Sequence, residues 1–135
     1  NISIESRSRI FRKVHVLNNI SEPELHYLYI HARALLFPSL MEGFGWPPLE
    51  AQSFGCPVIA SSAGSLSEIL SDSALTIKPD DPNEIARKTS YLLKKPEMAK
   101  IIIRKGLKNA ARFPIKDTVK KYSDLYREVL DRSKR

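Results

Sequence analysis

Short apolar runs alternate with amphipathic segments along most of the chain, and this alternation predicts strands that are each followed by a helix. Four runs have the length and composition of strands: residues 14–17, 34–37, 58–60 and 74–77. The second run is continuously apolar, as in a strand covered on both faces. Because strands that alternate with helices pair in parallel, we expect an α/β fold with a doubly wound, Rossmann-like parallel sheet of about four strands.

Helix signals stand between these runs. Ser21 with Glu24, and Ser65 with Glu68, each have the spacing of a capping box at a helix N-terminus. We expect helices from residue 21 to about 33, from the loop after residue 37 to about 54, and a short one after Ser65. Three helices complete the chain, and the last carries an apolar stripe at steps of four and three that requires a partner surface: Ile115, Val119, Tyr122, Tyr126 and Val129.

Composition is that of one globular domain over residues 1–135, with 42% hydrophobic and 27% charged residues. No apolar run reaches the roughly 18 residues that cross a bilayer, and the first residues lack the order of a signal peptide, so we expect a cytoplasmic protein. The single cysteine, Cys56, has no internal disulfide partner and is expected to be a small buried residue. No cysteine and histidine group has zinc spacing, so no metal or cofactor is expected.

Charge is divided along the chain. Residues 1–13 carry a net charge of +3, residues 14–82 carry −6, and residues 83–135 carry +10, with sixteen Lys and Arg against six acids. An acidic middle between basic ends lacks the single basic stripe of a nucleic-acid binder, and no RNA-binding or helix-turn-helix motif is present. Solvated helix faces explain most of the basic end. An alternative is that the basic C-terminal helices contact an anionic membrane surface or a phosphorylated substrate.

The chemistry concentrates in residues 39–51, SLMEGFGWPPLEA, which follow the second predicted strand. In a doubly wound sheet, ligands bind at the carboxyl ends of the strands, where this loop lies. Gly43 and Gly45 allow a tight turn and close approach of a ligand to the backbone. The amides of Gly43, Phe44, Gly45 and Trp46 can then face an anion. His26 and His31 are five apart on one predicted helix, so we assign them packing or surface roles.

Two carboxylates flank this turn. Since a residue before proline is disfavoured in the α region, we expect Trp46 and Pro47 to be extended and the helix to begin at Pro48. Glu50 then lies near the third helical position, with an N-cap that has no N–H to pair with it. Such a carboxylate suits two neighbouring ribose hydroxyls, or it serves only the helix dipole. Glu42, on the far side of the turn, would face a sugar beyond the phosphate.

Trp46 has two alternative roles. It could stack on a sugar or a base, but a tryptophan beside two prolines more often packs under its own loop, and we expect the latter.

The run FPSLMEGFGWPPLEAQSFGCPVIAS, residues 37–61, resembles the donor-binding segment of the group 1 family of retaining glycosyltransferases, which have two Rossmann-like domains and the GT-B fold. The segments SLSEIL, ALTIKP and DDPNEIA extend the resemblance over roughly residues 14–130. The resemblance implies transfer of a hexose, with retention, from a nucleoside diphosphate sugar to an acceptor hydroxyl. GFGWPPLE is similar to mannosyltransferases that use GDP-mannose; a UDP-sugar is the alternative, and the acceptor is not readable.

The resemblance also implies roles for single residues. Glu50 would bind the ribose hydroxyls, and the amides around Phe44, Gly45 and Trp46 would hold the diphosphate and the sugar hydroxyls. Glu42 would take the catalytic position at the donor sugar, where it positions the sugar and stabilises an oxocarbenium-like state. Asn18 and Asn19 resemble the loop near the nucleobase, although the family usually has glycine at the position of Asn18.

Length is the main departure from the family. The first two strands of the donor domain, and the whole acceptor domain, would precede residue 1, so the chain resembles the second half of a GT-B C-terminal domain that is inactive alone. With the order 3-2-1-4-5-6, its first strand would lack its neighbours, and we expect a rearranged edge, self-association or a swapped element. Alternatives are a non-catalytic nucleotide-binding or assembly module, or a relative of glycogen synthase or phosphorylase. Within the cytoplasm, we expect a location at the inner face of the membrane if the basic helices contact lipid.

Overall fold

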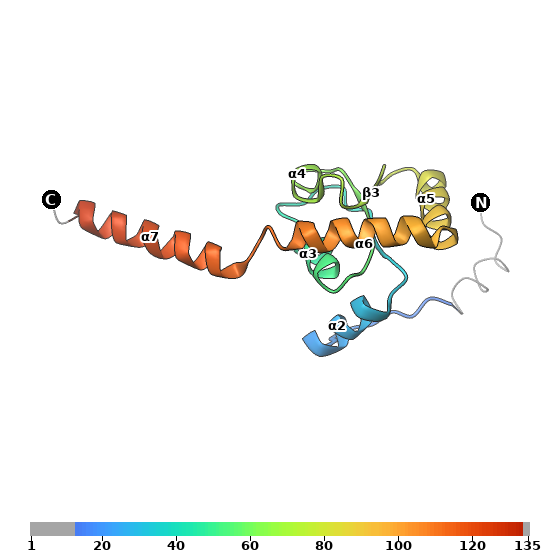
Figure 1. Cartoon of the computed structure of the whole chain (residues 1–135), viewed down its shortest axis with the longest axis horizontal. Coiled ribbons are helices and arrows are strands. Elements are labelled where there is room, and N and C mark those ends of the chain that lie inside the picture. The colour runs from blue at the N-terminus through green and yellow to red at the C-terminus, as the bar shows by residue number, and fades with distance from the viewer. Residues whose placement is uncertain (1–12, 134–135) are drawn as a thin grey trace.

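The computed structural model of the chain describes residues 13–133 and confirms the alternation of strands and helices (Figure 1). Residues 1–12, which include most of the basic N-terminal segment, lie outside the described part. In chain order, the elements are α2 (Glu22–His31), β1 (Leu35–Phe37), α3 (Trp46–Ser53), β2 (Val58–Ser61), α4 (Leu66–Leu70), β3 (Leu75–Ile77), α5 (Pro82–Lys94), α6 (Pro96–Ala110) and α7 (Ile115–Ser133).

The sheet of the described residues has three parallel strands in the order β1-β2-β3. Leu36 pairs with Ile59 in one ladder, and Ala60 pairs with Thr76 in the other. The prediction of about four strands was wrong by one, because residues 14–17 are exposed and join no ladder, with Val16 79% exposed. An apolar run becomes a strand only where a neighbouring strand supplies its hydrogen bonds, and none lies beside this segment in the described chain.

The order of the strands follows the order of the chain. The expected rearranged edge is therefore absent from the sheet of residues 13–133, and that alternative was wrong. Within the described residues, β1 pairs only with β2, so its outer edge carries unpaired backbone groups. Two crossover connections build this sheet. Each passes through a helix, α3 or α4, and returns the chain to the next parallel strand.

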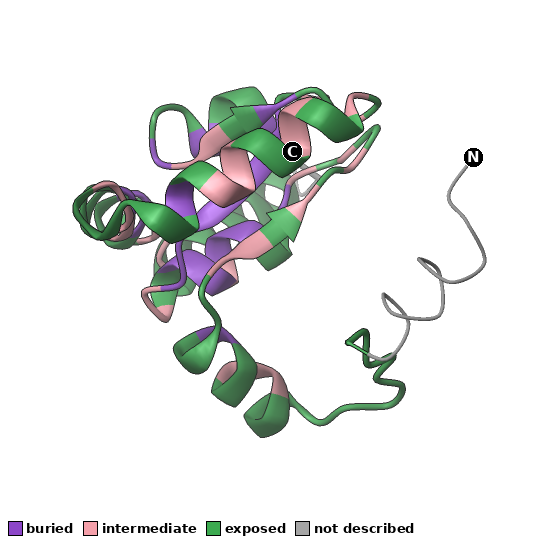
Figure 2. Ribbon diagram, turned by 90° about the vertical axis from the view of Figure 1, so that its right-hand side faces the viewer, coloured by how far each residue is buried: buried purple, intermediate pink, exposed green. Residues whose placement is uncertain are grey.

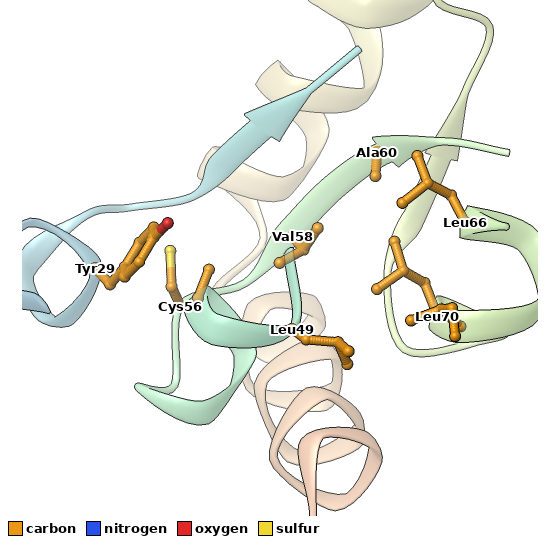
Figure 3. Close-up of a cluster of buried hydrophobic side chains, with 9 residues drawn as sticks. Tyr29, Leu49, Cys56, Val58, Ala60, Leu66 and Leu70 are labelled. Atoms are coloured by element: carbon orange, nitrogen blue, oxygen red, sulfur yellow. The ribbon is translucent and has the colours of Figure 1, made fainter. Parts of the chain in front are cut away.

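Helices cover both faces of the sheet, as expected for a doubly wound arrangement. Successive side chains of β2 point to opposite faces. Val58 and Ala60 belong to one buried cluster, which also receives residues of α3 and α4 (Figure 3). Ile59 belongs to a second buried cluster, formed with Ile77 of β3, Leu92 of α5 and Ile102 of α6. All of β2 is buried, which explains why its first three residues, 58–60, are apolar.

A buried polar network ties α6 to the sheet layer. The Asn109 side-chain amide donates to Gln52 Oε1 at 2.9 Å and to the Ile69 carbonyl at 3.0 Å. Gln52 in turn donates to the Ser73 hydroxyl at 2.8 Å and to the Ser73 carbonyl at 3.1 Å. Since these groups are buried, each needs its partner, and the network fixes how α6 packs on α3.

One of the two predicted capping boxes forms. The Glu24 carboxylate accepts from the Ser21 amide at 2.8 Å and from the Ser21 hydroxyl at 2.7 Å, so the first box is confirmed. The second was wrong: Ser65 has α-helical backbone angles and makes no side-chain cap, because its hydroxyl donates to the Glu42 carbonyl at 3.1 Å instead. The contact that replaces this cap joins two loops at the carboxyl edge of the sheet.

Candidate functional site

Two loops meet where β1 and β2 end. The amide and the hydroxyl of Ser65 both donate to the Glu42 carbonyl, at 3.3 and 3.1 Å. Gly64 has a φ of +57°, and a Cβ placed there would lie 2.6 Å from the Glu42 carbonyl oxygen. Only glycine fits this close approach of backbone to backbone. The loop after β2 therefore holds the backbone of Glu42 in place.

The carboxylate of Glu42 is partly buried at the surface of its loop. The Ser39 hydroxyl lies 3.2 Å from Oε1 of Glu42 and 2.9 Å from the Met41 carbonyl, and these two acceptors share its one proton. Ser39 is itself anchored, because the Ser61 hydroxyl at the end of β2 donates to its carbonyl at 2.5 Å. The Glu42 carboxylate thus still has free acceptor positions for a ligand. Residues at the end of β2 and in the loop after it hold both its backbone and its side chain.

The glycine turn presents backbone amides at the start of α3. Among the described residues, the N–H groups of Gly43, Phe44 and Gly45 donate no hydrogen bond to the protein. Gly45 has a φ of +104° and is the N-cap of α3, and the Phe44 ring packs edge-on against Phe113 at 5.8 Å. Free amides at a helix N-terminus favour an anion, because the helix dipole adds to their partial positive charge.

The start of α3 differs from the prediction. The helix begins at Trp46, so Trp46 and Pro47 are helical rather than extended, and Glu50 is the fifth helical residue rather than the third. The left-handed Gly45 allows this start, and the prolines are tolerated because amides of the first turn have no partner within the helix. Glu50 therefore lies outside the capping positions, and the N-cap, Gly45, has an N–H, unlike the expected Pro47.

The Glu50 side chain on α3 instead contacts α2. The Tyr29 hydroxyl donates to Oε2 of Glu50 at 3.4 Å, and His26 Nε2 lies 3.5 Å from Oε1. Phe54, the C-cap of α3, packs against both rings, with centroid distances of 4.4 Å to His26 and 6.2 Å to Tyr29. Burial, and then the negative charge of Glu50, raise the pKa of Tyr29 to about 12.

Glu50 also borders a cleft of about 420 Å³ between α3 and the end of α6. The cleft is lined by Trp46, Leu49, Glu50, Ser53, Ala110 and Phe113. Burial of Glu50 among internal bonds, away from any cavity, would have removed it from a ligand site. Its side chain is 38% exposed and its two contacts are long, so about half of its four acceptor positions stay available.

Three further residues were predicted to lie in the donor site: Asn18, Asn19 and Trp46. Asn18 and Asn19 are exposed in the segment before α2, and no hydrogen bond joins them to the loop of Glu42 in the described part of the chain. Trp46 contacts Phe44 with a ring distance of 4.7 Å but is 60% exposed, so it packs on its loop only in part. Cys56 is buried, as expected, and burial raises its pKa.

No group of three or more metal-binding side chains is found among residues 13–133.

Tyr29 was not among the predicted site residues, and His26 was assigned only a packing or surface role, whereas both contact Glu50. Both lie on one face of α2, three positions apart, and this spacing was the only available signal. Their contact with Glu50 depends on how α2 packs on α3, which no local pattern specifies.

Comparisons with known proteins find relatives of both the sequence and the fold. A family model described as "Glycosyl transferases group 1" matches residues 8–109. O-antigen chain mannosyltransferase B of Escherichia coli is 36% identical over 100 residues, which are 74% of this chain and 26% of that protein. O-antigen chain mannosyltransferase RfbU of Salmonella typhimurium is 46% identical over 69 residues, which are 51% of this chain and 20% of that protein.

A solved structure also matches the fold of the chain. Sucrose-phosphate synthase from Thermosynechococcus elongatus superposes with a TM-score of 0.83 and 26% identity, over 95% of this chain and 34% of that chain. The chain therefore spans a fifth to a quarter of the two curated relatives and about a third of the solved structure.

Proposed function

The chain belongs to the group 1 glycosyltransferases, and we propose that it is the part of such an enzyme that binds the nucleoside diphosphate of a sugar donor. In this proposal, the amides of Gly43, Phe44 and Gly45 hold the diphosphate and Glu50 accepts hydrogen bonds from the ribose hydroxyls. One observation carries it: unpartnered amides precede the first turn of α3, and a partly exposed carboxylate follows on its second turn.

The proposed reaction is transfer of a hexose from the donor to an acceptor hydroxyl with retention of configuration, in the full-length protein. Glu42 positions the donor sugar and stabilises positive charge at the anomeric carbon. Its fixed backbone and its bond from Ser39 support this role, because electrostatic stabilisation requires a preorganised group.

The donor we propose is GDP-mannose, with a UDP-sugar as the alternative. This choice rests on relatives: the proteins from Escherichia coli and Salmonella typhimurium are named mannosyltransferases, as is an α-(1→4)-mannosyltransferase of Mycolicibacterium hassiacum that is 36% identical over 86 residues.

Calorimetry with UDP, GDP and their sugar conjugates tests the site. We expect weak binding of a nucleoside diphosphate and at least a tenfold loss in Glu50→Ala, which is about 1.4 kcal/mol. Glu97→Ala is the matched control, since Glu97 is exposed on α6 and its one ion pair among residues 13–133 is with Lys100. Equal affinity in the wild type and Glu50→Ala would remove Glu50 from the site.

Glu42→Ala separates the two carboxylates. It should leave the affinity for the nucleoside diphosphate unchanged and weaken only the sugar conjugate, because Glu42 is assigned to the sugar. A loss for both ligands would place Glu42 at the phosphates or in the fold of the loop.

Amides and a helix dipole, rather than a metal ion, balance the diphosphate charge in this proposal. The affinity should then change less than about twofold when a chelator replaces magnesium in the same titration.

Self-association through the outer edge of β1 is part of the proposal for the chain alone. An exposed strand edge is a template for pairing with another chain. Sedimentation equilibrium should show a concentration-dependent dimer, and a monomer at every concentration would exclude it.

The proposed place of action is the cytoplasm, at the inner face of a membrane. Within residues 13–133, no helix combines the length and the hydropathy of a membrane span. The net charge of +10 over residues 83–135 supports contact with an anionic surface.

A further inference from the structure

His26 on α2 lies beside the carboxylate that would bind the ribose. Its Nε2 is 3.5 Å from Oε1 of Glu50, and the two side chains are 35% and 38% exposed. The His26 ring also packs on Phe54, with a centroid distance of 4.4 Å and an interplanar angle of 32°. Packing on Phe54 explains where the ring lies, but the approach of Nε2 to a carboxylate indicates a second role.

The two contacts of Glu50 with α2 fall on different oxygens. The Tyr29 hydroxyl donates to Oε2, whereas His26 lies at Oε1. Since each carboxylate oxygen accepts about two hydrogen bonds, each oxygen keeps one acceptor position. Two neighbouring ribose hydroxyls need one acceptor position on each oxygen. His26 and Tyr29 therefore hold Glu50 from α2 without competing with the ribose.

His26 is the group at this carboxylate that can gain a positive charge near neutral pH. Histidine is the side chain whose charge ordinarily changes between about pH 5 and 8. Tyr29, with a pKa of about 12, stays neutral in this range, and so does the adjacent Cys56, because burial raises its pKa. On α3, which packs against α2, Glu50 is the one charged residue.

The other titratable side chains of α2 do not neutralise this charge. Glu24 accepts hydrogen bonds from Ser21 at the start of the helix. His31 packs on Tyr27 with a ring distance of 4.2 Å. No ion pair joins Glu22 to His26 among residues 13–133, where the acid paired with His26 is Glu50.

A protonated His26 favours the donor in two ways. Its ion pair with Oε1 limits the rotation of the Glu50 carboxylate, so that the carboxylate is already oriented when the ribose arrives. Its positive charge also offsets part of the repulsion between Glu50 and the diphosphate. Because ion pairs between partly exposed side chains are weak, the expected effect is a small factor in affinity.

We propose that His26 is a positioning residue of the donor site, which in its protonated form holds Glu50 for the ribose hydroxyls and strengthens donor binding as the pH falls. This role rests on the proposed function, since it requires that Glu50 binds the ribose.

Calorimetry of the chain with GDP-mannose, between about pH 5.5 and 8, tests this role. The sugar conjugate is preferred to GDP because its terminal phosphate is esterified and lacks the ionisation that a free phosphate group has near pH 6. We expect the wild type to bind about two- to fivefold more tightly at the lower pH. His26→Gln, whose side chain cannot gain a charge, should bind with the same affinity at both pH values.

Two further variants separate the charge of His26 from its packing. His26→Phe keeps an aromatic ring against Phe54 and should also lose the pH dependence. His31→Gln makes the same change as His26→Gln on the same helix, away from Glu50, and should keep the wild-type dependence.

The outcomes distinguish this role from the donor site itself. A wild-type pH dependence in His26→Gln would overturn the role of His26, as would tighter binding of the wild type at the higher pH. Either result, together with weaker binding by Glu50→Ala, would leave the donor site intact. No binding by the wild type, or equal affinity in Glu50→Ala at every pH, would overturn the proposed function and the role of His26 with it.

Discussion

The Tyr29 hydroxyl lies 3.4 Å from Oε2 of Glu50 and donates a hydrogen bond to it, which joins α2 to the carboxylate at the cleft of α3. The bond is long, while Tyr29 as a residue is only 7% exposed and its ring packs beside Phe54. A fixed donor on one side of a carboxylate limits its rotation. Tyr29 is therefore placed to orient Glu50 without occupying the cleft, whose lining does not include it.

Tyr29→Phe tests this orienting role and rests on the proposed donor site. The variant keeps the buried ring and removes only the hydroxyl, so we expect a two- to fivefold loss of affinity for the nucleoside diphosphate, below about 1 kcal/mol. The matched ligand is a 2′,3′-dideoxynucleoside diphosphate, which has no hydroxyls for Glu50 to accept from. Its affinity should be the same for both proteins in calorimetry, and an equal loss for both ligands would contradict the role.

The ionisation of Tyr29 gives a second test that needs no ligand. Burial is the larger cause of its pKa of about 12, and the charge of Glu50 is the next. Glu50→Gln should therefore lower the Tyr29 pKa while leaving it above the unfolded value of about 10. The measurement is the tyrosinate absorbance of each protein minus that of its Tyr29→Phe variant. An unchanged pKa in Glu50→Gln would show that the two groups do not interact.

The same shift fixes the direction of a stability change. The unfolded chain releases the Tyr29 proton near pH 10, whereas the folded chain keeps it until about pH 12. The free energy of unfolding should be insensitive to this group below pH 10 and should fall as the pH rises from about 10 to 12. In Tyr29→Phe, this part of the decline should disappear from urea unfolding curves.

The polar network under α6 predicts a large effect at a site far from any ligand. Asn109→Ala leaves Gln52 Oε1 and the Ile69 carbonyl without a buried partner, so the free energy of unfolding should fall by about 1–3 kcal/mol. Lys108→Ala, at the exposed neighbouring position, should change it by less than about 0.5 kcal/mol. Similar losses in both variants, measured by urea unfolding, would mean that the helix and not the network is responsible.

The sequence predicted those parts of the fold that depend on local patterns. The apolar run of β2 could be read because this strand is covered on both faces. The expectation that the run at residues 34–37 is covered on both faces was wrong, since Leu36 of β1 is 42% exposed. Residues 14–17 have a similar pattern and form no strand, since pairing depends on a neighbour that a local pattern does not contain. The exposed surface of this segment and of α2 is visible in Figure 2.

In the candidate site too, local patterns predicted some features, while others depend on packing. Glu42, Glu50 and the glycine turn were found because they lie within thirteen residues of one motif. The prediction that α3 begins at Pro48 was wrong, because the rule for residues before proline describes an average preference. Here the left-handed backbone of Gly45 allows the helix to begin at Trp46. Tyr29 reaches Glu50 across twenty-one positions of sequence, and Ser65 reaches Glu42 across twenty-three. Contacts of this kind arise from packing and have no signature in the motif.

Gly64→Ala tests whether the loop after β2 holds Glu42 in place. A methyl group would meet the Glu42 carbonyl oxygen at 2.6 Å and the Glu42 nitrogen at 3.2 Å, and alanine is strained at a φ of +57°. Because both neighbours are backbone atoms, the loops must move apart, and we expect a loss of about 1–3 kcal/mol in the free energy of unfolding.

The chain offers a matched control for this change within the same pair of loops. Gly43 has no heavy atom within 4 Å of an added Cβ and is not among the residues with positive φ, so Gly43→Ala should change the free energy of unfolding by less than about 0.5 kcal/mol. Gly64→Ala should also weaken binding of the sugar conjugate more than that of the nucleoside diphosphate, since it displaces Glu42 rather than Glu50. If Gly64→Ala were as stable as Gly43→Ala, the contact between the loops would not form in solution, and the positioning of Glu42 from β2 would have to be abandoned.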